Sequence, residues 1–269
     1  MNTKKILILV DFSEVSMSLM RYGLALSRHL GAEVWIQYVY YIPPNFAGEV
    51  YIPVDALENY KKKVHKQFEN LRKEHAEFKN VNFVMNYGDL LTETNRLIEQ
   101  EDIGLVVMGK KGGGFLTNVL GSNTLKMIEH ARCPVLSVPE DIEFEVFHHL
   151  ALAIDLKDTK SEIFHFLVDF AQAFSSKVDI IHVSEAPVAI DATKLQPAIE
   201  TAFSDVPHQF FHIHAVDVEK SIEKHMVGNS VDLLVLLPRS HSFFDRLFQK
   251  RITRQAAFQS KVPLLSIHI

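Results

Sequence analysis

The residues best suited to chemistry form a glycine-rich segment at positions 109–124. Glycines stand at 109, 112, 113, 114 and 121, and Ser122 follows the last of them. A loop without side chains lets backbone amides approach a phosphate, and the free N–H groups and positive dipole end of a following helix suit an anion. The pattern therefore predicts a phosphate-binding loop that leads into a helix near residue 122.

Two common nucleotide motifs do not describe this segment. It is not a P-loop, because Lys110 and Lys111 precede the clustered glycines and no Gly-Lys-Ser or Gly-Lys-Thr follows them. It is not the dinucleotide fingerprint, because that motif follows the first strand of its unit, whereas this loop follows the fourth. Either lysine could add a charge contact to a phosphate. The plain alternative, a flexible loop with a helix cap, stays open.

A sheet must position this loop, and the chain contains its pattern twice. Residues 5–11 form a short apolar run that ends in Asp11, which is typical of a strand buried on both faces of a parallel sheet. Residues 149–155 repeat the pattern at an offset of 144 (155 minus 11). The first helix is expected to open at Ser13, which can cap it. Asp11 has an alternative interpretation as a helix-capping acid.

A second offset relates the later strands of the two copies. At 129 positions (238 minus 109), residues 105–109 align with 234–238, and residues 134–138 align with 263–267. The two offsets differ by 15 residues. The difference falls between the second and third strands of each copy.

The 15-residue difference corresponds to a helix that is longer in the first copy than in the second. The first copy has a long polar helix, 55–78, and the second a short one, 195–203. Each copy then alternates strands and helices as a doubly wound, five-stranded parallel sheet of the α/β class. We expect two domains, 1–140 and 146–269, joined by the acidic segment 140–147.

The signature residues of the loop resemble those of a known family. Gly109, Gly112, Gly121 and Ser122 follow the order of the motif Gly-x2-Gly-x9-Gly-Ser/Thr, and Asp11 ends the first strand. With these residues the chain resembles the universal stress proteins in a tandem form. The resemblance implies two Rossmann-like, adenine nucleotide alpha hydrolase-like domains, packed as a pseudo-dimer about a pseudo-two-fold axis through their last strands.

The resemblance also implies a ligand and its binding residues. The ligand is an adenine nucleotide, ATP or AMP, with or without Mg²⁺. The implied residues are Leu9, Asp11, Val39, Met108, Gly109, Lys111, Gly112, Gly121, Ser122, Asn123 and Thr124. Two of these positions depart from the family pattern: Leu9 stands where a proline is usual, and Gly112 is followed by eight rather than nine residues before Gly121.

The second copy has lost the loop. Residues 238–253 contain no glycine. The bulky side chains there are Phe243, Phe244 and Phe248. We predict that this copy does not bind nucleotide. A residual anion site is the minor alternative, built from Arg239, Lys250 and Arg251.

Composition excludes several other classes of function. The net charge is −5, and the sequence has no run of five or more like charges that would indicate a surface for nucleic acid or an anionic membrane. Apolar runs fall far short of the roughly 18 residues of a membrane span. Cys133 is the single cysteine and is interpreted as a buried small residue rather than a nucleophile. His212 and His214 share a strand face but lack a third metal ligand. A cytoplasmic location is the expectation.

These observations favour a nucleotide-binding, stress-response protein over an enzyme. Hydrolysis needs a positioned water, a base and metal ligands, and only Asp11 and Ser122 are available for such a task. Two alternatives stay open: an interaction module in which both sites are vestigial, and a slow ATPase. A homodimer and an unidentified protein partner are also left open.

Overall fold

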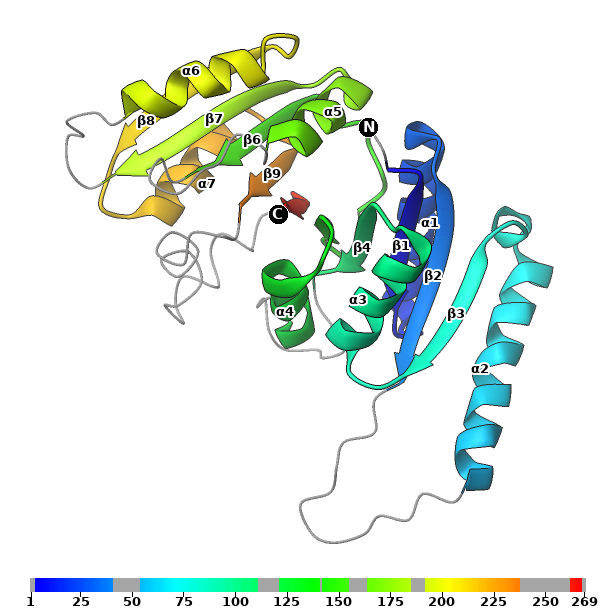
Figure 1. Cartoon of the computed structure of the whole chain (residues 1–269). Coiled ribbons are helices and arrows are strands. Elements are labelled where there is room, and N and C mark those ends of the chain that lie inside the picture. The colour runs from blue at the N-terminus through cyan, green and yellow to red at the C-terminus, as the bar shows by residue number, and fades with distance from the viewer. Residues whose placement is uncertain are drawn as a thin grey trace, which may run out of the picture.

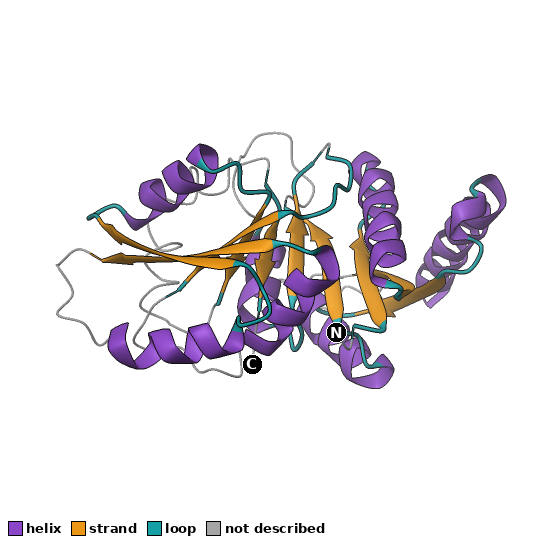
Figure 2. Ribbon diagram, turned by 90° about the horizontal axis from the view of Figure 1, so that it is seen from above, coloured by secondary structure: helices purple, strands orange, loops and turns teal. Residues whose placement is uncertain are grey.

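The computed structural model describes residues 3–40, 54–110, 121–140, 142–154, 164–184, 192–237 and 262–267. These residues form one ten-stranded sheet in the order β3-β2-β1-β4-β5-β10-β9-β6-β7-β8 (Figure 1). Helices cover both faces of the sheet (Figure 2). The strand pairs within each half are parallel, and the pair that joins the halves is antiparallel.

The first half runs from β1 to β5. Its elements are β1 (Lys5–Val10), α1 (Glu14–Leu30), β2 (Glu33–Tyr40), α2 (Val54–Glu74), the 3-10 turn η1 (Ala76–Phe78), β3 (Asn82–Tyr87), α3 (Leu90–Glu101), β4 (Leu105–Gly109), α4 (Ser122–His130) and β5 (Val135–Val138).

The second half runs from β6 to β10. Its described elements are β6 (His149–Ala153), α5 (Phe164–Phe174), β7 (Lys177–Ser184), α6 (Ala192–Ala202), β8 (His208–His214), α7 (Val218–Gly228), β9 (Leu233–Leu236) and β10 (Leu264–Ser266). The predicted doubly wound α/β fold is confirmed, and so is the contrast between a long α2 and a short α6.

Strand register confirms the first sequence offset and corrects the second. Lys5 pairs with Glu33 in β1·β2, and His149 pairs with Lys177 in β6·β7, both shifted by 144. The pair Ile6 and Leu105 of β1·β4 recurs as Leu150 and Leu233 in β6·β9, however, so the fourth strand is shifted by 128 (233 minus 105). The predicted offset of 129 for this strand is wrong by one residue.

The correction changes how the connections between the fourth and fifth strands compare. The fifth strands keep the offset of 129, because Val106 pairs with Val135 and Leu234 pairs with Leu264. The connection that contains the glycine loop is therefore one residue shorter in the first half than in the second.

The two halves meet at the predicted pseudo-two-fold axis. Leu136 of β5 lies opposite Leu265 of β10, and these residues are equivalent under the offset of 129. Both are fully buried. Pairing β5 with β10 removes two apolar edges that would otherwise invite association with other chains.

A shared core also joins the halves on one face of the sheet. The ring of His29, in α1, stacks on Phe174 of α5 with centroids 4.4 Å apart, and its Nε2 lies 3.1 Å from the carbonyl oxygen of Ala173. Phe144 and Phe147, in the segment between the halves, pack against the same ring of Phe174. One hydrophobic cluster runs through both halves. We propose that the repeat units 1–140 and 146–269 fold as one cooperative body.

The contact between α1 and β1 provides a test of this core. Gly23 is buried, and a Cβ atom added there would lie 2.3 Å from Cδ1 of Ile8. Gly23→Val is expected to lower the free energy of unfolding by about 1–3 kcal/mol through overpacking. Urea unfolding measures the change. Gly228→Ala, where no atom lies within 4 Å of the added Cβ, is the control. An unchanged midpoint for Gly23→Val would contradict the packing described here.

Candidate functional site

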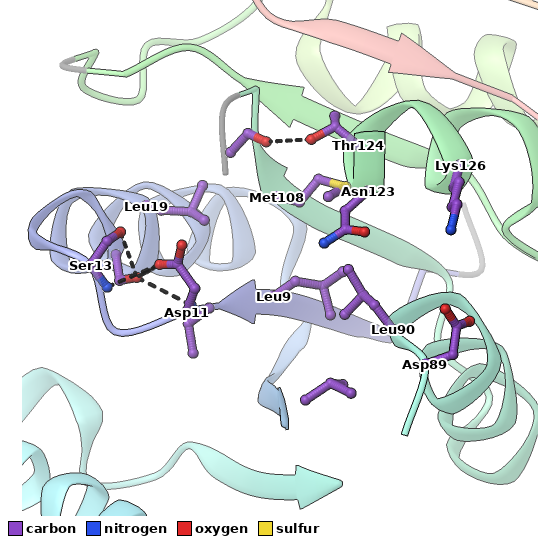
Figure 3. A pocket seen from close by; sticks show the side chains of 14 residues that line it. Leu9, Asp11, Ser13, Leu19, Asp89, Leu90, Met108, Asn123, Thr124 and Lys126 are labelled. Atoms are coloured by element: carbon purple, nitrogen blue, oxygen red, sulfur yellow. Dashed lines mark hydrogen bonds between the residues drawn. The ribbon is translucent and has the colours of Figure 1, made fainter. Parts of the chain in front are cut away.

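A pocket of about 330 Å³ lies at the carboxyl ends of β1 and β4 (Figure 3). Strand order reverses between these two strands, which is where ligands bind in open parallel sheets. Seven of the predicted residues line the pocket: Leu9, Asp11, Val39, Met108, Gly109, Asn123 and Thr124. The fold therefore brings together residues from both ends of the first half.

The middle of the pocket is apolar. Leu9, Leu90 and Met108 direct their side chains into it, and Val39 adds to the lining (Figure 3). The volume is at the lower end of the range of about 300–1,000 Å³ for small-molecule sites.

Asp11 is held in place by the start of α1. Its Oδ1 accepts hydrogen bonds from the backbone N of Ser13 at 3.0 Å and from Oγ of Ser16 at 2.9 Å. Burial of the carboxyl by itself raises its pKa, but the hydrogen bonds from Ser13 and Ser16 outweigh burial, so the pKa of Asp11 lies below its ordinary value. Both of these hydrogen bonds end on Oδ1, and the carboxylate as a whole lies in the lining of the pocket.

The capping prediction is half right. Ser13 is the N-cap residue of α1, but its side chain makes no capping hydrogen bond. Asp11 takes part of that function through the Ser13 amide. The interpretation of Asp11 as a helix-capping acid is thus confirmed for one oxygen, and its carboxylate also lines the pocket.

The start of α4 forms another wall of the pocket. Gly121 is its N-cap residue, and the Gly121 amide donates to the carbonyl oxygen of Lys110 at 3.2 Å. The buried hydroxyl of Thr124 donates to the carbonyl oxygen of Gly109 at 3.1 Å. These bonds fix the first turn of α4 on the end of β4. The first-turn N–H groups of a helix lack partners inside the helix and suit an anion.

The remaining four predicted residues are not among the described residues that line the pocket. Gly121 and Ser122 open α4 beside the pocket without belonging to its lining. Lys111 and Gly112 lie outside the described residues, as does the segment 238–253 of the second half.

The suggested phosphate contact of Lys110 is wrong. Lys110 is 6% exposed, and its Nζ donates to the carbonyl oxygen of Val262, in the second half, at 2.7 Å. It does not line the pocket.

Sequence reasoning missed part of the lining. The missed residues are Val10, Ser13, Ser16, Leu19, Asp89, Leu90 and Lys126. Asp89 follows β3 and caps α3, with Oδ1 accepting from the Thr92 amide at 3.0 Å. Its place after a parallel strand was the available signal, because carboxyl ends of such strands share one edge of the sheet. Lys126 lies one helical turn after Ser122, on the same side of α4.

His212 and His214 of β8, considered as metal ligands, and the single cysteine, considered as a nucleophile, have surroundings that suit a structural role. His182 of β7 lies beside His212 with ring centroids 5.1 Å apart, and Nδ1 of His214 donates to the carbonyl oxygen of Ser184 at 3.1 Å. Among the described residues, no three His, Cys, Asp or Glu side chains are arranged to hold a metal ion. Burial raises the pKa of Cys133 to about 12, which is unsuited to a nucleophile at neutral pH.

Fold and site together define a class: a tandem, doubly wound α/β protein with a pocket at the point where strand order reverses. Residues 2–139 match the sequence model described as the universal stress protein family. The chain belongs to that family. Across the described residues, no helix has the length and apolar character needed to cross a membrane.

Solved structures show the same fold along the whole chain. A universal stress protein from Archaeoglobus fulgidus DSM 4304 superimposes with a TM-score of 0.72 at 16% identity, covering 97% of this chain and 94% of that one. A putative universal stress protein from Pseudomonas aeruginosa UCBPP-PA14 gives a TM-score of 0.60 at 12% identity, covering 99% and 94%. Universal stress protein G of Shigella flexneri is 37% identical over 54 residues, which are 20% of this chain and 38% of that protein's length.

Proposed function

We propose that this protein binds an adenine nucleotide, ATP or AMP, in the pocket of its first half and acts in the cytoplasm as a stress-response binding protein. The observation that carries the proposal is the convergence of seven predicted residues on one pocket at the reversal point of the sheet. Those residues come from β1, the residue directly after it, β2, β4 and α4, so the fold, rather than any single motif, brings them together.

The pocket offers suitable residues for each part of a nucleotide: the base, the ribose and the phosphates. The adenine ring fits the apolar slot between Leu9, Leu90 and Met108. The carboxylate of Asp11 suits a ribose hydroxyl, which is the group that an acid after a strand binds in dinucleotide folds. The start of α4 suits the phosphates.

Binding without turnover is the activity that the pocket supports. Its carboxylates among the described residues are Asp11 and Asp89, and each already accepts a hydrogen bond that holds the start of a helix. Neither is placed as a free general base. Mg²⁺ that accompanies the phosphates would need few protein ligands, since it keeps several of its waters.

Calorimetry with ATP and with AMP, each with and without Mg²⁺, tests the proposal on the wild type and on Gly121→Asp. Gly121 has φ −60° and ψ 148°, a conformation open to any residue, and aspartate is a good N-cap residue. The substitution should therefore preserve α4 and place a negative charge near the phosphates. At about 4 Å and an effective dielectric constant of about 20, repulsion of about 4 kcal/mol weakens binding by about a hundredfold or more.

Gly121→Asn is the matched control, because it has nearly the same size and capping ability without the charge. Its affinity should lie between those of the wild type and Gly121→Asp. Absence of binding in all three proteins would favour the interaction module instead, and ADP release from ATP would favour the slow ATPase.

A further inference from the structure

Lys110 occupies an unusual position at the root of the glycine loop. It is the residue directly after β4, yet its side chain is buried and its ammonium donates to the carbonyl oxygen of Val262 at 2.7 Å. Val262 belongs to the second half and precedes β10. The charged group thus connects the base of the loop in one half to the backbone of the other.

The backbone of Lys110 joins the end of β4 to β5 and to the start of α4. Its amide donates to the carbonyl oxygen of Val138, in β5, at 2.8 Å. Its carbonyl oxygen accepts from the Gly121 amide at 3.2 Å and from the Thr124 hydroxyl at 3.4 Å. Residues 110 and 121 are therefore tied together, and the second half is tied to the same point.

Simple packing does not account for a lysine at this position. Burial disfavours the ammonium and lowers the pKa of Lys110 to about 8, so a neutral side chain of similar length would fit at lower cost. The ammonium makes a directed contact with a main-chain oxygen of the other half. That contact is what the lysine provides and an apolar residue would not.

We propose that Lys110 is a positioning residue that fixes the end of β4 and the start of α4, where the phosphates are proposed to bind, against the second half. The second half then serves phosphate binding in the first through the Val262 carbonyl. This inference rests on the proposed function. It predicts a dependence on Lys110 for ligands that carry phosphates and none for adenosine.

The test compares ATP and adenosine binding by the full-length wild type and Lys110→Met, with Lys66→Met, an exposed lysine of α2, as the control. ATP affinity of Lys110→Met should fall about tenfold or more, as expected for loss of a hydrogen bond to a charged group, while adenosine affinity stays within about twofold. Equal losses for both ligands, or no loss for either, would overturn the inference. If Lys110→Met does not fold, Lys110→Gln carries the same comparison.

Hydrogen exchange separates this inference from the proposed function. In Lys110→Met without ligand, the Gly121 amide should exchange about tenfold faster or more than in the wild type, because its acceptor is less firmly held. Unchanged exchange would overturn the positioning role even if ATP binds. If the wild type binds neither ATP nor adenosine, the proposed function is wrong. If the Gly121 amide nevertheless exchanges faster in Lys110→Met than in the wild type, Lys110 still anchors the start of α4.

Discussion

Asp179→Ala is expected to lower the free energy of unfolding by about 3–5 kcal/mol, the range for removing one partner of a buried ion pair. Asp179, in β7, is 6% exposed. Its Oδ1 lies 3.0 Å from Nε2 of His149, and its Oδ2 lies 2.7 Å from Nε2 of His225. One carboxylate thus serves two buried imidazoles.

The ring of His149 explains why the loss is large. Its Nδ1 donates to the carbonyl oxygen of Asn229 at 2.9 Å, while Nε2, on the other side of the ring, faces Asp179. The contact of Nε2 with Asp179 has the distance of an ion pair without the alignment of a hydrogen bond. Alanine would remove the carboxylate that the buried Nε2 of His149 faces and would leave His225 without its acceptor.

Urea unfolding of Asp179→Ala against the wild type measures the effect. Asp205→Ala, an exposed aspartate in the turn after α6, is the control and should change stability by no more than about 0.5 kcal/mol. Equal midpoints for Asp179→Ala and the wild type would show that the carboxylate contributes nothing. The cluster joins the first residue of β6 to the last turn of α7, at the edge of the sheet away from the carboxyl strand ends, so nucleotide binding by the folded variant should be unchanged.

The strands were predictable because burial on both faces leaves continuous apolar runs, and the repeat supplied each strand with a second example. The register of the fourth strand, in contrast, could not be predicted from the sequence. Residues 105–109 and 233–237 are apolar or nearly so throughout, and a shift by one residue leaves such a run equally buried. Only the hydrogen-bonded pairs, such as Leu150 with Leu233, decide the register.

The lining of the pocket was predictable from sequence only where a motif includes the residue. Asp11 and the start of α4 carry recognisable patterns, whereas Ser16, Asp89 and Lys126 reach the pocket only because the fold gathers the ends of separate elements. Lys110 shows most clearly what sequence patterns cannot predict, which is a contact with a residue far away in the chain. Its sequence neighbours suggest a phosphate contact, but its partner, Val262, is 152 residues away and belongs to the other half.

The same lysine predicts a gain in stability at alkaline pH. Burial lowers the pKa of Lys110 from an ordinary 10.5 to about 8, so between these values the unfolded chain binds a proton that the folded chain has released. The free energy of unfolding rises with pH wherever the unfolded state binds more protons. The contribution of Lys110 therefore rises by roughly 3 kcal/mol from neutral pH to about pH 10.5.

Lys110→Met lacks this contribution, so the stability of the wild type minus that of the variant should increase over this range. Burial also raises the pKa values of Tyr22 and Tyr38, which lowers stability at high pH, but it does so in both proteins and cancels in the difference. Urea unfolding at intervals from pH 7 to about pH 10 measures the difference, and Lys66→Met should show no such trend. A difference that stays constant with pH would mean that the ammonium of Lys110 remains hydrated in the folded chain, and the burial that makes it an anchor between the halves would then be absent in solution.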